Sequence, residues 1–480
     1  MRDDVFHTGL HLGLGLLVVL GVLNLRFSGT LPFIIIFLFR YIRVLVNLHS
    51  YLFLYEASTL PKNPSIKPEN VAVLIQTIGD KGDDFKDSVK RIANQRPYEI
   101  IICTTSANNN LETLEAARDD IQRQLKQETQ GRPYHEVPIY CLAIEEQNRR
   151  KQFIHSLETS LALPQLPTIQ DTPSTSPEPR GRENVLHNPN VTAVVMCDDH
   201  TFIRPGFLQY ILAPLNNNGK VYIVNGSERV RRIRHSTWRK DFLNYVACVY
   251  AARHNFECAA TYALDGGHFD VSGRFVVMRK ELWEDKRTRE AYVSERWGDS
   301  DKVLIPDDDA WIGRQCTQIG KEAAFQLDES HMLDIHLGNE TWSKFNAQIL
   351  RWARTSFRNG WTALYDDEIW KKKPWNAYAV HLTGLLSFPL LFDFLLGYNL
   401  YSATGLLGQH WVRWCLFCFW LFTKFLEPSG HWRMEKRDLI YAIPGLFFGW
   451  YYSIVKLRAL FTVYDISWSG RASGEKEKSN

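Results

Sequence analysis

The sequence predicts an α/β domain with a parallel sheet, placed between apolar segments at the two ends of a 480-residue chain. Two observations lead to this fold class. Short apolar runs alternate with helical patterns between residues 71 and 197, and long apolar stretches gather near both termini. The net charge of +3 is close to balance, so no nucleic-acid partner is expected.

The alternation starts with VAVLIQTI at 71–78, a continuous apolar run typical of a buried strand. The run EIIIC at 99–103 and the segment 137–144 predict two more strands. In parallel sheets, ligands bind at the carboxyl ends of the strands. The polar residues at these ends are therefore predicted to touch a ligand: Gln76, Thr77, Thr104 and Thr105.

Helices are predicted between these strands. After the first strand, Phe85, Val89 and Ile92 fall on one face of a helix, and a second helix is predicted over 111–127. Strand, helix and strand in this order form the βαβ unit of a parallel sheet.

Residues 164–190 are rich in Pro, Ser and Thr. A domain boundary would explain such a stretch, but 191–197 is again an apolar strand pattern. A flexible surface insertion is therefore favoured.

The strand at 191–197 runs into Asp198, Asp199 and His200. Carboxylates are rarely buried without a partner. These residues alone favour a polar turn over a divalent metal site. Their place at a strand end, where this type of sheet binds its ligand, gives weight to the metal site.

Both ends of the chain contain candidate membrane segments. Residues 8–25 carry no charge and nearly reach the length of a bilayer core. The stretch 31–54 contains Arg40 and Arg43, so it is either a second span or an interfacial helix. Three further segments are predicted at 377–400, 404–426 and 438–464.

Basic residues orient the C-terminal segments. Lys371–Lys373 precede the first segment, and Arg433, Lys436 and Arg437 follow the second, which predicts a hairpin with both ends in the cytosol. The eight cysteines are scattered and mostly sit in apolar contexts, such as Cys248, Cys415 and Cys418, in keeping with a reducing, cytosol-facing middle domain.

Four motifs occur in a characteristic order: DGGHFDVSGR at 265–274, PDDDAWI at 306–312, QILRW at 348–352 and WSGR at 468–471. Together with the acid pair at 198–199, this set resembles the processive family 2 glycosyltransferases, the cellulose, chitin and hyaluronan synthases. It looks closest to the fungal type 2, capsular-polysaccharide-synthase-like branch. The resemblance covers residues 71–471 without the insertion.

The resemblance implies a multi-pass protein of the plasma membrane with a GT-A-type cytosolic domain over 59–373. Membrane segments would occupy 1–58 and 374–466, and 467–480 would hold a gating-type segment and a polar tail. The implied partners are a UDP-sugar, a polysaccharide acceptor and the lipid bilayer, with Mn²⁺ or Mg²⁺ as the cofactor. Neither the sugar nor the oligomeric state can be deduced.

The resemblance also assigns roles to the acids. Asp198 matches the first acid of a DxD motif, Asp199 its middle position, and His200 stands where the second acid is usual. Oxygen ligands suit Mg²⁺ and Mn²⁺, whereas imidazole suits Mg²⁺ poorly. Asp309 matches the catalytic base, whose proton affinity Asp308 would raise by charge repulsion. Capping of the following helix is the alternative role for these acids.

The remaining motif residues would bind substrate. Gln348, Arg351 and Trp352 share one face of a helix, where Arg351 suits a diphosphate and Trp352 a sugar ring; an amphipathic helix on the membrane surface is the alternative. By the same resemblance, Ser272 and Gly273 of the DGGHFDVSGR motif would lie near the acceptor. Trp468 and Arg471 of the WSGR motif would close over the nucleotide. The alternatives for these motifs are a simple turn and a disordered tail.

The leading hypothesis is an inverting polysaccharide synthase that also exports its product. A transferase that glycosylates a membrane lipid, as ceramide glucosyltransferases do, is the second hypothesis. A non-catalytic membrane protein is the third, because the second strand ends in Cys103-Thr104-Thr105 without the Asp that is usual in the family.

Overall fold

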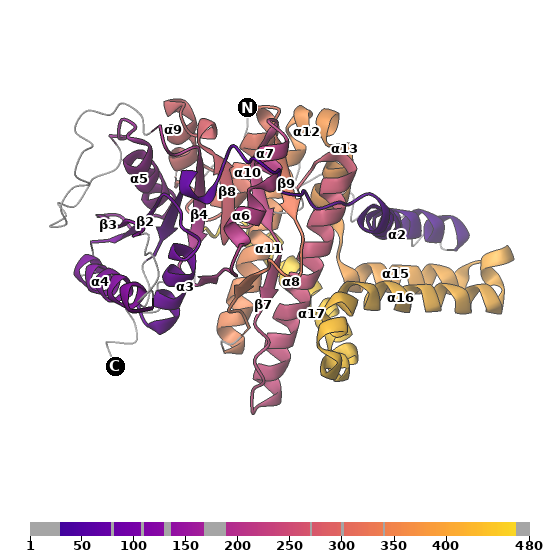
Figure 1. The fold of residues 1–480 in the computed structure, drawn as a ribbon. Coiled ribbons are helices and arrows are strands. Elements are labelled where there is room, and N and C mark those ends of the chain that lie inside the picture. The colour runs from indigo at the N-terminus through magenta and orange to yellow at the C-terminus, as the bar shows by residue number, and fades with distance from the viewer. Residues whose placement is uncertain are drawn as a thin grey trace.

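A seven-stranded, mostly parallel sheet forms the centre of the computed structural model, with the strand order β3-β2-β1-β4-β8-β6-β9 (Figure 1). Only β8 runs antiparallel to its neighbours in this sheet. The structure describes residues 29–77, 81–106, 110–128, 136–167, 189–268, 271–298, 302–338 and 341–466. The strands of this sheet are β1 (Val71–Gln76), β2 (Glu99–Thr105), β3 (Ile139–Ile144), β4 (Ala193–Asp198), β6 (Val221–Gly226), β8 (Phe275–Arg279) and β9 (Glu322–Gln326).

The predicted strands are confirmed as β1 to β4, all parallel to one another. The antiparallel β8 and the strands β6 and β9 beyond it were not predicted, since their short apolar runs pair only with strands distant in the sequence. A second sheet joins β5 (Thr201–Phe202), β10 (Leu333–Ile335) and β7 (Glu228–Val230). Of the proposed insertion, residues 168–188 lie outside the described residues.

Side chains alternate between the two faces of the sheet, as the strand period requires. Along β1, Val71, Val73 and Ile75 enter one core, and Ala72 and Leu74 enter the other. The first core includes α3 (Asp83–Ala93), α4 (Asn110–Glu128), α8 (Trp238–Asp265) and α11 (Trp342–Leu364). The second includes α5 (Arg149–Leu161), α9 (Lys286–Ser294) and α10 (Asp308–Gln318).

Short helices complete this part of the chain. They include α6 (Phe207–Ile211), α7 (Ala213–Asn217), α12 (Asp367–Lys372), α13 (Pro374–Asn376), a π-helical turn (Ala377–Leu382) and α14 (Thr383–Leu386), with 3₁₀ turns at Pro68–Asn70 and Lys280–Leu282.

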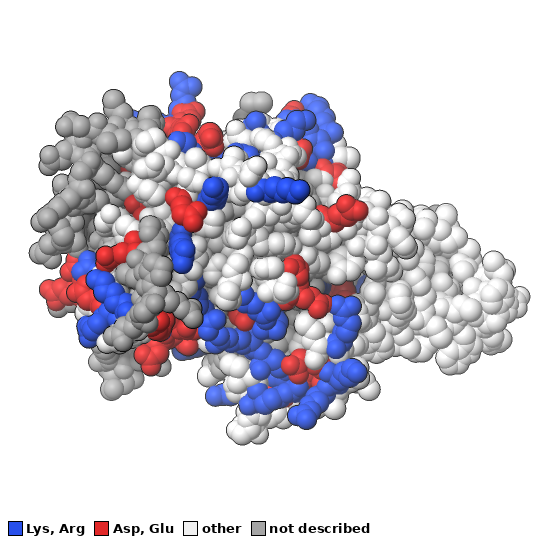
Figure 2. Space-filling view, in the orientation of Figure 1, with Lys and Arg blue, Asp and Glu red and all other residues white. Residues whose placement is uncertain are grey.

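Three helices extend away from the sheet and form what we call the helical projection: α2 (Thr30–Phe53), α15 (Pro389–Ser402) and α16 (His410–Met434) (Figure 1). The visible surface of its far part is free of charged side chains (Figure 2). The charges lie inside instead. Asp393 binds Arg40 at 3.0 Å and Lys424 at 2.9 Å, and it accepts hydrogen bonds from Trp420 and Trp450. The buried charges are thus paired while the outer surface stays apolar.

The predicted segment 377–400 is not one straight helix. The chain bends by 88° between Leu386 and Pro389, so that α15 enters the projection while α14 stays beside α11. Pro389 begins the new helix, a position where proline is favoured because its missing N–H has no helical partner. Lys456 stabilises the break by donating hydrogen bonds of 2.6 Å to the carbonyls of Gly384 and Ser387.

Within the described residues, α2 is the one helix that is by itself long and apolar enough to cross a membrane, and the bent pair 374–386 and 389–402 passes only if it is one span. The predicted span at 8–25 lies outside the described residues.

A buried charge network fixes the connection between α16 and α17 (Ala442–Phe461) to the start of α8. Asp438, whose side chain is fully buried, accepts hydrogen bonds from Arg232 at 2.8 and 3.0 Å and lies 2.7 Å from Nε2 of His431. Tyr441 donates a 2.6 Å hydrogen bond to Asp241.

The Asp438→Ala variant is expected to lose about 3 kcal/mol or more of unfolding free energy, because it leaves Arg232 buried with one carboxylate fewer. The control is Glu435→Ala, which removes a half-exposed partner of Arg234 and should cost about 1 kcal/mol or less. Denaturant unfolding of the detergent-purified protein measures both. Equal losses would contradict the importance of the buried network.

Candidate active site

The acid pair lies at the carboxyl end of β4, but its two carboxylates turn in different directions. Oδ1 of Asp198 accepts a 2.6 Å hydrogen bond from Arg149. Asp199 turns back toward β1, where Oδ2 accepts a 2.6 Å bond from the Thr77 hydroxyl and Oδ1 lies 2.9 Å from Nδ1 of His200. In the described part of the chain, no group of three or more His, Cys, Asp or Glu side chains could hold a metal ion. The three predicted ligands thus do not converge, since protein donors occupy Asp199.

Arg149 links the acid pair to the other predicted motifs, and it was not predicted from the sequence. Its Nη2 donates to Asp198 and, at 2.8 Å, to the carbonyl oxygen of Gly273, while its Nε lies 3.3 Å from Oδ2 of Asp308. Arg149 begins α5, which Asn148 caps. Its place five residues after the third predicted strand was the available signal, because the chain there is still near the carboxyl edge of the sheet.

The three aspartates at 307–309 have different surroundings. Asp307 has a φ of 66° and directly precedes α10, but its side chain makes no capping bond. Its carboxylate instead pairs with Arg358 on α11 at 2.5 and 3.1 Å and accepts a short bond from Thr355. Burial would raise the pKa of Asp307, but the Arg358 guanidinium outweighs burial and holds that pKa below its usual range. Asp307 therefore joins α10 to α11.

Asp309 has the properties expected of a proton acceptor. Burial and the neighbouring charge of Asp308 raise the pKa of Asp309 to about 6, against the opposing effect of Arg149. Its Oδ2 accepts a 3.2 Å bond from the amide of Gly273, and its Oδ1 accepts a 2.8 Å bond from the amide of Ala310. The predicted Ser272-Gly273 loop is thus in contact with Asp309.

The QILRW helix is confirmed as part of α11, which carries Gln348, Arg351 and Trp352. Trp352 is not an open platform. Its ring stacks on Tyr250 with centroids 5.0 Å apart and an interplanar angle of 16°, and the Arg274 guanidinium lies 5.7 Å from its centroid. The protein itself therefore already covers part of this aromatic surface.

Arg274 ends the DGGHFDVSGR motif but was not among the predicted site residues. It follows Ser272-Gly273 and forms a short ion pair with the buried Glu228. Burial would raise the pKa of Glu228, yet Arg274 keeps that pKa below its usual value. The pair holds the loop against β7, beside Trp352.

The polar residues at the ends of β1 and β2 leave hydrogen-bonding atoms unused. Oε1 of Gln76, Oγ1 of Thr104 and Oε1 of Gln152 are buried and have no hydrogen-bond partner among the described residues. Gln76 lies opposite Asp198 in the strand register, and Gln152 donates to the carbonyl of Thr77. Such atoms are rare in folded proteins and call for a physical explanation.

The predicted Trp468 and Arg471 lie outside the described residues. The chain that leads to them is fixed beside the site. Arg358 donates a 2.9 Å bond to the carbonyl of Val463, and Arg354 pairs with Asp465 at 2.8 Å. The same α11 arginine thus binds both Asp307 and the end of α17.

Comparisons with known proteins agree on one class. A family model described as "Glycosyltransferase like family 2" matches residues 119–355. A "Type 2 glycosyltransferase" of Pyricularia oryzae is 27% identical over 449 residues, covering 93% of this chain and 83% of that protein. One of Gibberella zeae is 27% identical over 441 residues, covering 91% and 74%.

Among solved structures, a mannosyltransferase, PcManGT from Pyrobaculum calidifontis in complex with GDP-Man and Mn²⁺, has a similar fold. The TM-score is 0.50 at 13% identity, and the match covers 92% of this chain and 99% of that one. At this identity the likeness shows the fold alone.

Two substitutions of Asp307 separate its ion pair from its backbone conformation. Asp307→Gly and Asp307→Ala both leave Arg358 without its carboxylate, so both should lose about 3–5 kcal/mol of unfolding free energy. The Ala variant should lose about 1–2 kcal/mol more, because a Cβ is strained at a φ of 66°.

The matched control is Asp465→Ala, which removes the half-exposed partner of Arg354 and should cost less than about 1 kcal/mol. Denaturant titrations measure all three variants. A Gly variant as stable as the unsubstituted protein would rule out a structural role for the ion pair.

Proposed function

The chain carries a glycosyltransferase family 2 domain and is a glycosyltransferase, and from this premise we propose the reaction it catalyses. It transfers a sugar from a nucleotide-diphosphate donor, a UDP-sugar, to the hydroxyl of a growing polysaccharide, with inversion at the anomeric carbon. The acceptor chain then leaves through the membrane helices of the same protein.

The observation that carries this proposal is the environment of Asp309. With a pKa of about 6, its carboxylate is ionised near neutral pH and still basic enough to accept a proton from the acceptor hydroxyl. Gly273 and Ala310 fix both of its oxygens by amide hydrogen bonds, so its orientation is set before substrate binds. In this role Asp309 is the catalytic base.

Two features support a nucleotide-diphosphate donor at the carboxyl edge of the sheet. The guanidinium of Arg149 lies among Asp198 and Asp308 at the strand ends, where its planar donors could bind phosphate oxygens. The unused polar atoms of Gln76 and Thr104 could hydrogen-bond a nucleobase or ribose.

A divalent metal fits this site when the donor supplies most of the ligands. The Asp198 side chain is 40% exposed at the strand end, which leaves its second oxygen available. Mg²⁺ sites commonly use one or two carboxylates together with substrate phosphates and water. Asp198 would hold the ion, Asp199 and His200 follow it in the chain, and the ion would supply positive charge for the departing diphosphate.

The helical projection supports the membrane part of the proposal. An apolar outer surface around a paired charge cluster is what a lipid environment requires. The helices α15 and α16 form a hairpin that leads away from the catalytic domain and back to it. Arg433, in the last turn of α16, pairs with Glu329 of that domain.

The position of α17 also agrees with a cytosolic chain end. Its beginning and its end are both bound to the catalytic domain, through Asp438 and Val463, and its exposed apolar residues recur at helical spacing. This pattern is typical of an interfacial helix rather than a span. The exposed residues are Ile443, Phe447, Ile454, Leu457 and Phe461.

A donor screen tests the proposal. Full-length protein in detergent with Mn²⁺ is incubated with several UDP-sugars and with GDP-mannose, and nucleotide release is measured. The Asp309→Asn variant should lose at least about 100-fold of the activity, the usual contribution of a general base. Asp87→Asn, at a partly exposed aspartate on α3, is the control and should retain the activity.

Sizing the product then identifies the acceptor class. A long polymer supports the synthase, whereas a single sugar on a lipid would replace it by the lipid transferase. Full activity of Asp309→Asn would remove Asp309 from the catalytic role.

The rate should also depend on pH. Because the base must be deprotonated, kcat/KM is expected to fall as the pH drops below about 6. Asp308→Asn removes a neighbouring negative charge, which lowers the pKa of Asp309 and should move this acid limb to lower pH. A pH profile of nucleotide release for both proteins checks the shift; an unmoved limb would mean that another group controls it.

A further inference from the structure

Two distant segments of the chain meet beside the helical projection and form what we call the basic surface. The first is the start of α8, with Trp238, Arg239 and Lys240, and the second is the 3₁₀ turn Lys436–Tyr441 between α16 and α17. The buried network of Asp438 joins them, since its partner Arg232 is 206 residues away in the chain. Figure 2 shows Lys and Arg side chains gathered at the lower end of the molecule, where α8 begins in Figure 1.

The basic surface carries cations that have no acidic partner. Its acids bind other arginines, because Asp438 binds Arg232 and Glu435 binds Arg234. Four exposed basic side chains make no ion pair with any residue that the structure describes, and these are Arg239, Lys240, Lys436 and Arg437. Their positive charge is therefore available to an anion from outside the protein.

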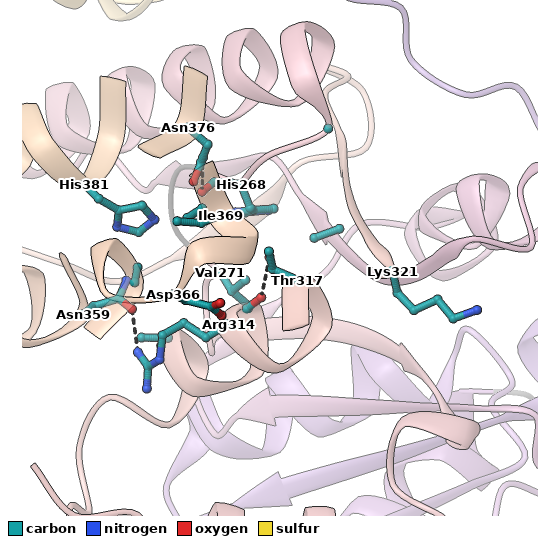
Figure 3. Close-up of a pocket in the computed structure, with 15 residues that line it drawn as sticks. His268, Val271, Arg314, Thr317, Lys321, Asn359, Asp366, Ile369, Asn376 and His381 are labelled. Atoms are coloured by element: carbon teal, nitrogen blue, oxygen red, sulfur yellow. Dashed lines mark hydrogen bonds between the residues drawn. The ribbon is translucent and has the colours of Figure 1, made fainter. Parts of the chain in front are cut away.

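Arg314, inside the catalytic domain, shows the opposite situation. It lines a small pocket, and its guanidinium donates to Asn359 (Figure 3) and to Glu295, each at 2.5 Å. Pairing of this kind leaves little charge for a ligand. The cations of the basic surface differ because they are exposed and unpaired.

Large apolar side chains are exposed on the same two segments. Trp238 is 57% exposed and Ile440 is 70% exposed. Trp238 stacks on Phe242 with ring centroids 5.2 Å apart and lies 6.1 Å from the ring of Tyr441, so both segments share one aromatic cluster. Beyond Ile440, the exposed apolar residues of α17 begin with Ile443. Cations beside an exposed tryptophan and aliphatic side chains are typical of a surface that lies on a membrane.

Membrane topology alone does not account for all of these cations. The positive-inside rule concerns loops that flank a membrane segment, and Lys436 and Arg437 follow α16 in this way. Arg239 and Lys240 belong instead to α8, a helix of the catalytic domain that follows β7. The fold brings the start of this helix to the turn after α16, so the complete surface is a property of the folded protein.

We infer that the basic surface binds anionic phospholipids of the leaflet that faces the catalytic domain. Its four unpaired cations contact the headgroups, and Trp238 and Ile440 lie among the headgroups and the first acyl carbons. Continuity with the apolar side chains of α17 favours a lipid over an acidic protein. The inference rests on the membrane placement in the proposed function. It adds that the protein selects lipids by charge, which sugar transfer does not require.

Native mass spectrometry of the full-length protein tests this selection. The protein, in a nonionic detergent, is mixed with equal amounts of phosphatidylserine and phosphatidylcholine, and the bound molecules of each are counted. A basic side chain near an anionic surface favours binding by about 5-fold, so the unsubstituted protein should bind at least about 10-fold more phosphatidylserine. This preference should fall at high ionic strength, because salt screens exposed charges.

The test variant removes the four cations and should bind the two lipids about equally. It carries Arg239→Gln, Lys240→Gln, Lys436→Gln and Arg437→Gln. If it fails to fold, as judged by thermal unfolding, the variant with only the two α8 substitutions is used, and it should lose at least about 3-fold of the preference.

The matched control also loses two arginines and two lysines, on α4 and α9 at the opposite end of the molecule from the projection (Figure 1). It should keep the preference of the unsubstituted protein. Its substitutions, all at exposed residues, are Arg123→Gln, Lys126→Gln, Lys286→Gln and Arg287→Gln.

Three results would overturn the inference. They are equal binding of the two lipids by the unsubstituted protein, an unchanged preference in the test variant, and an equal loss in the control. Glycerophosphoserine, the headgroup without acyl chains, should not displace the lipid, and displacement at equal concentration would overturn the assignment to a lipid. Nucleotide release is measured separately. Equal binding of both lipids together with nucleotide release would reject lipid selection and keep the proposed function.

Discussion

The arrangement of the site depends on one constraint, which is that the fold brings four aspartates to the carboxyl edge of one sheet. Asp198 and Asp199 end β4, and Asp308 and Asp309 begin α10. Carboxylates this close disfavour one another's charge. Arg149 offsets the repulsion from the start of α5, because it contacts Asp198 and Asp308 and also binds the carbonyl of Gly273. Burial, together with the remaining repulsion from Asp308, raises the pKa of Asp309 to about 6.

A second ion pair determines where the QILRW helix lies relative to these acids. Asp307 occupies a left-handed conformation that a glycine would adopt more easily. The free energy lost to this backbone strain has to be offset by interactions of the Asp307 side chain. That contribution is the pair with Arg358, which sets α10 against α11 and hence Asp309 relative to Trp352. Since Arg358 also binds Val463, the end of α17 is held in the same network. The left-handed residue Asp307 is thus held by the same arginine that binds the end of α17.

The sequence was sufficient for the local parts of this arrangement. Apolar runs identified β1 to β4, and Phe85, Val89 and Ile92 marked the buried face of α3, because strand and helix periods are properties of neighbouring residues. What it could not supply was pairing over long distances. Arg149 belongs to no recognised motif and Arg274 was only the last residue of DGGHFDVSGR, and their importance follows only from partners 49 and 46 residues away in the chain. The separate orientations of Asp198 and Asp199 were hidden for the same reason, since Thr77 comes from another strand.

Membrane topology was the hardest part to predict because hydropathy cannot distinguish a span from a helix that lies along the catalytic domain. The segment 377–400 is mostly apolar, yet it is not one helix. Pro389 begins a new helix, and Lys456 binds the carbonyls of Gly384 and Ser387, so one part lies against α11 and the other belongs to the projection. With α15 going out and α16 returning, the direction of the chain is restored before α17 begins. Both ends of α17 are bound to the catalytic domain, the first through Asp438 and the second through Val463. Residues up to 466 therefore stay beside Asp307, within a few residues of the WSGR motif.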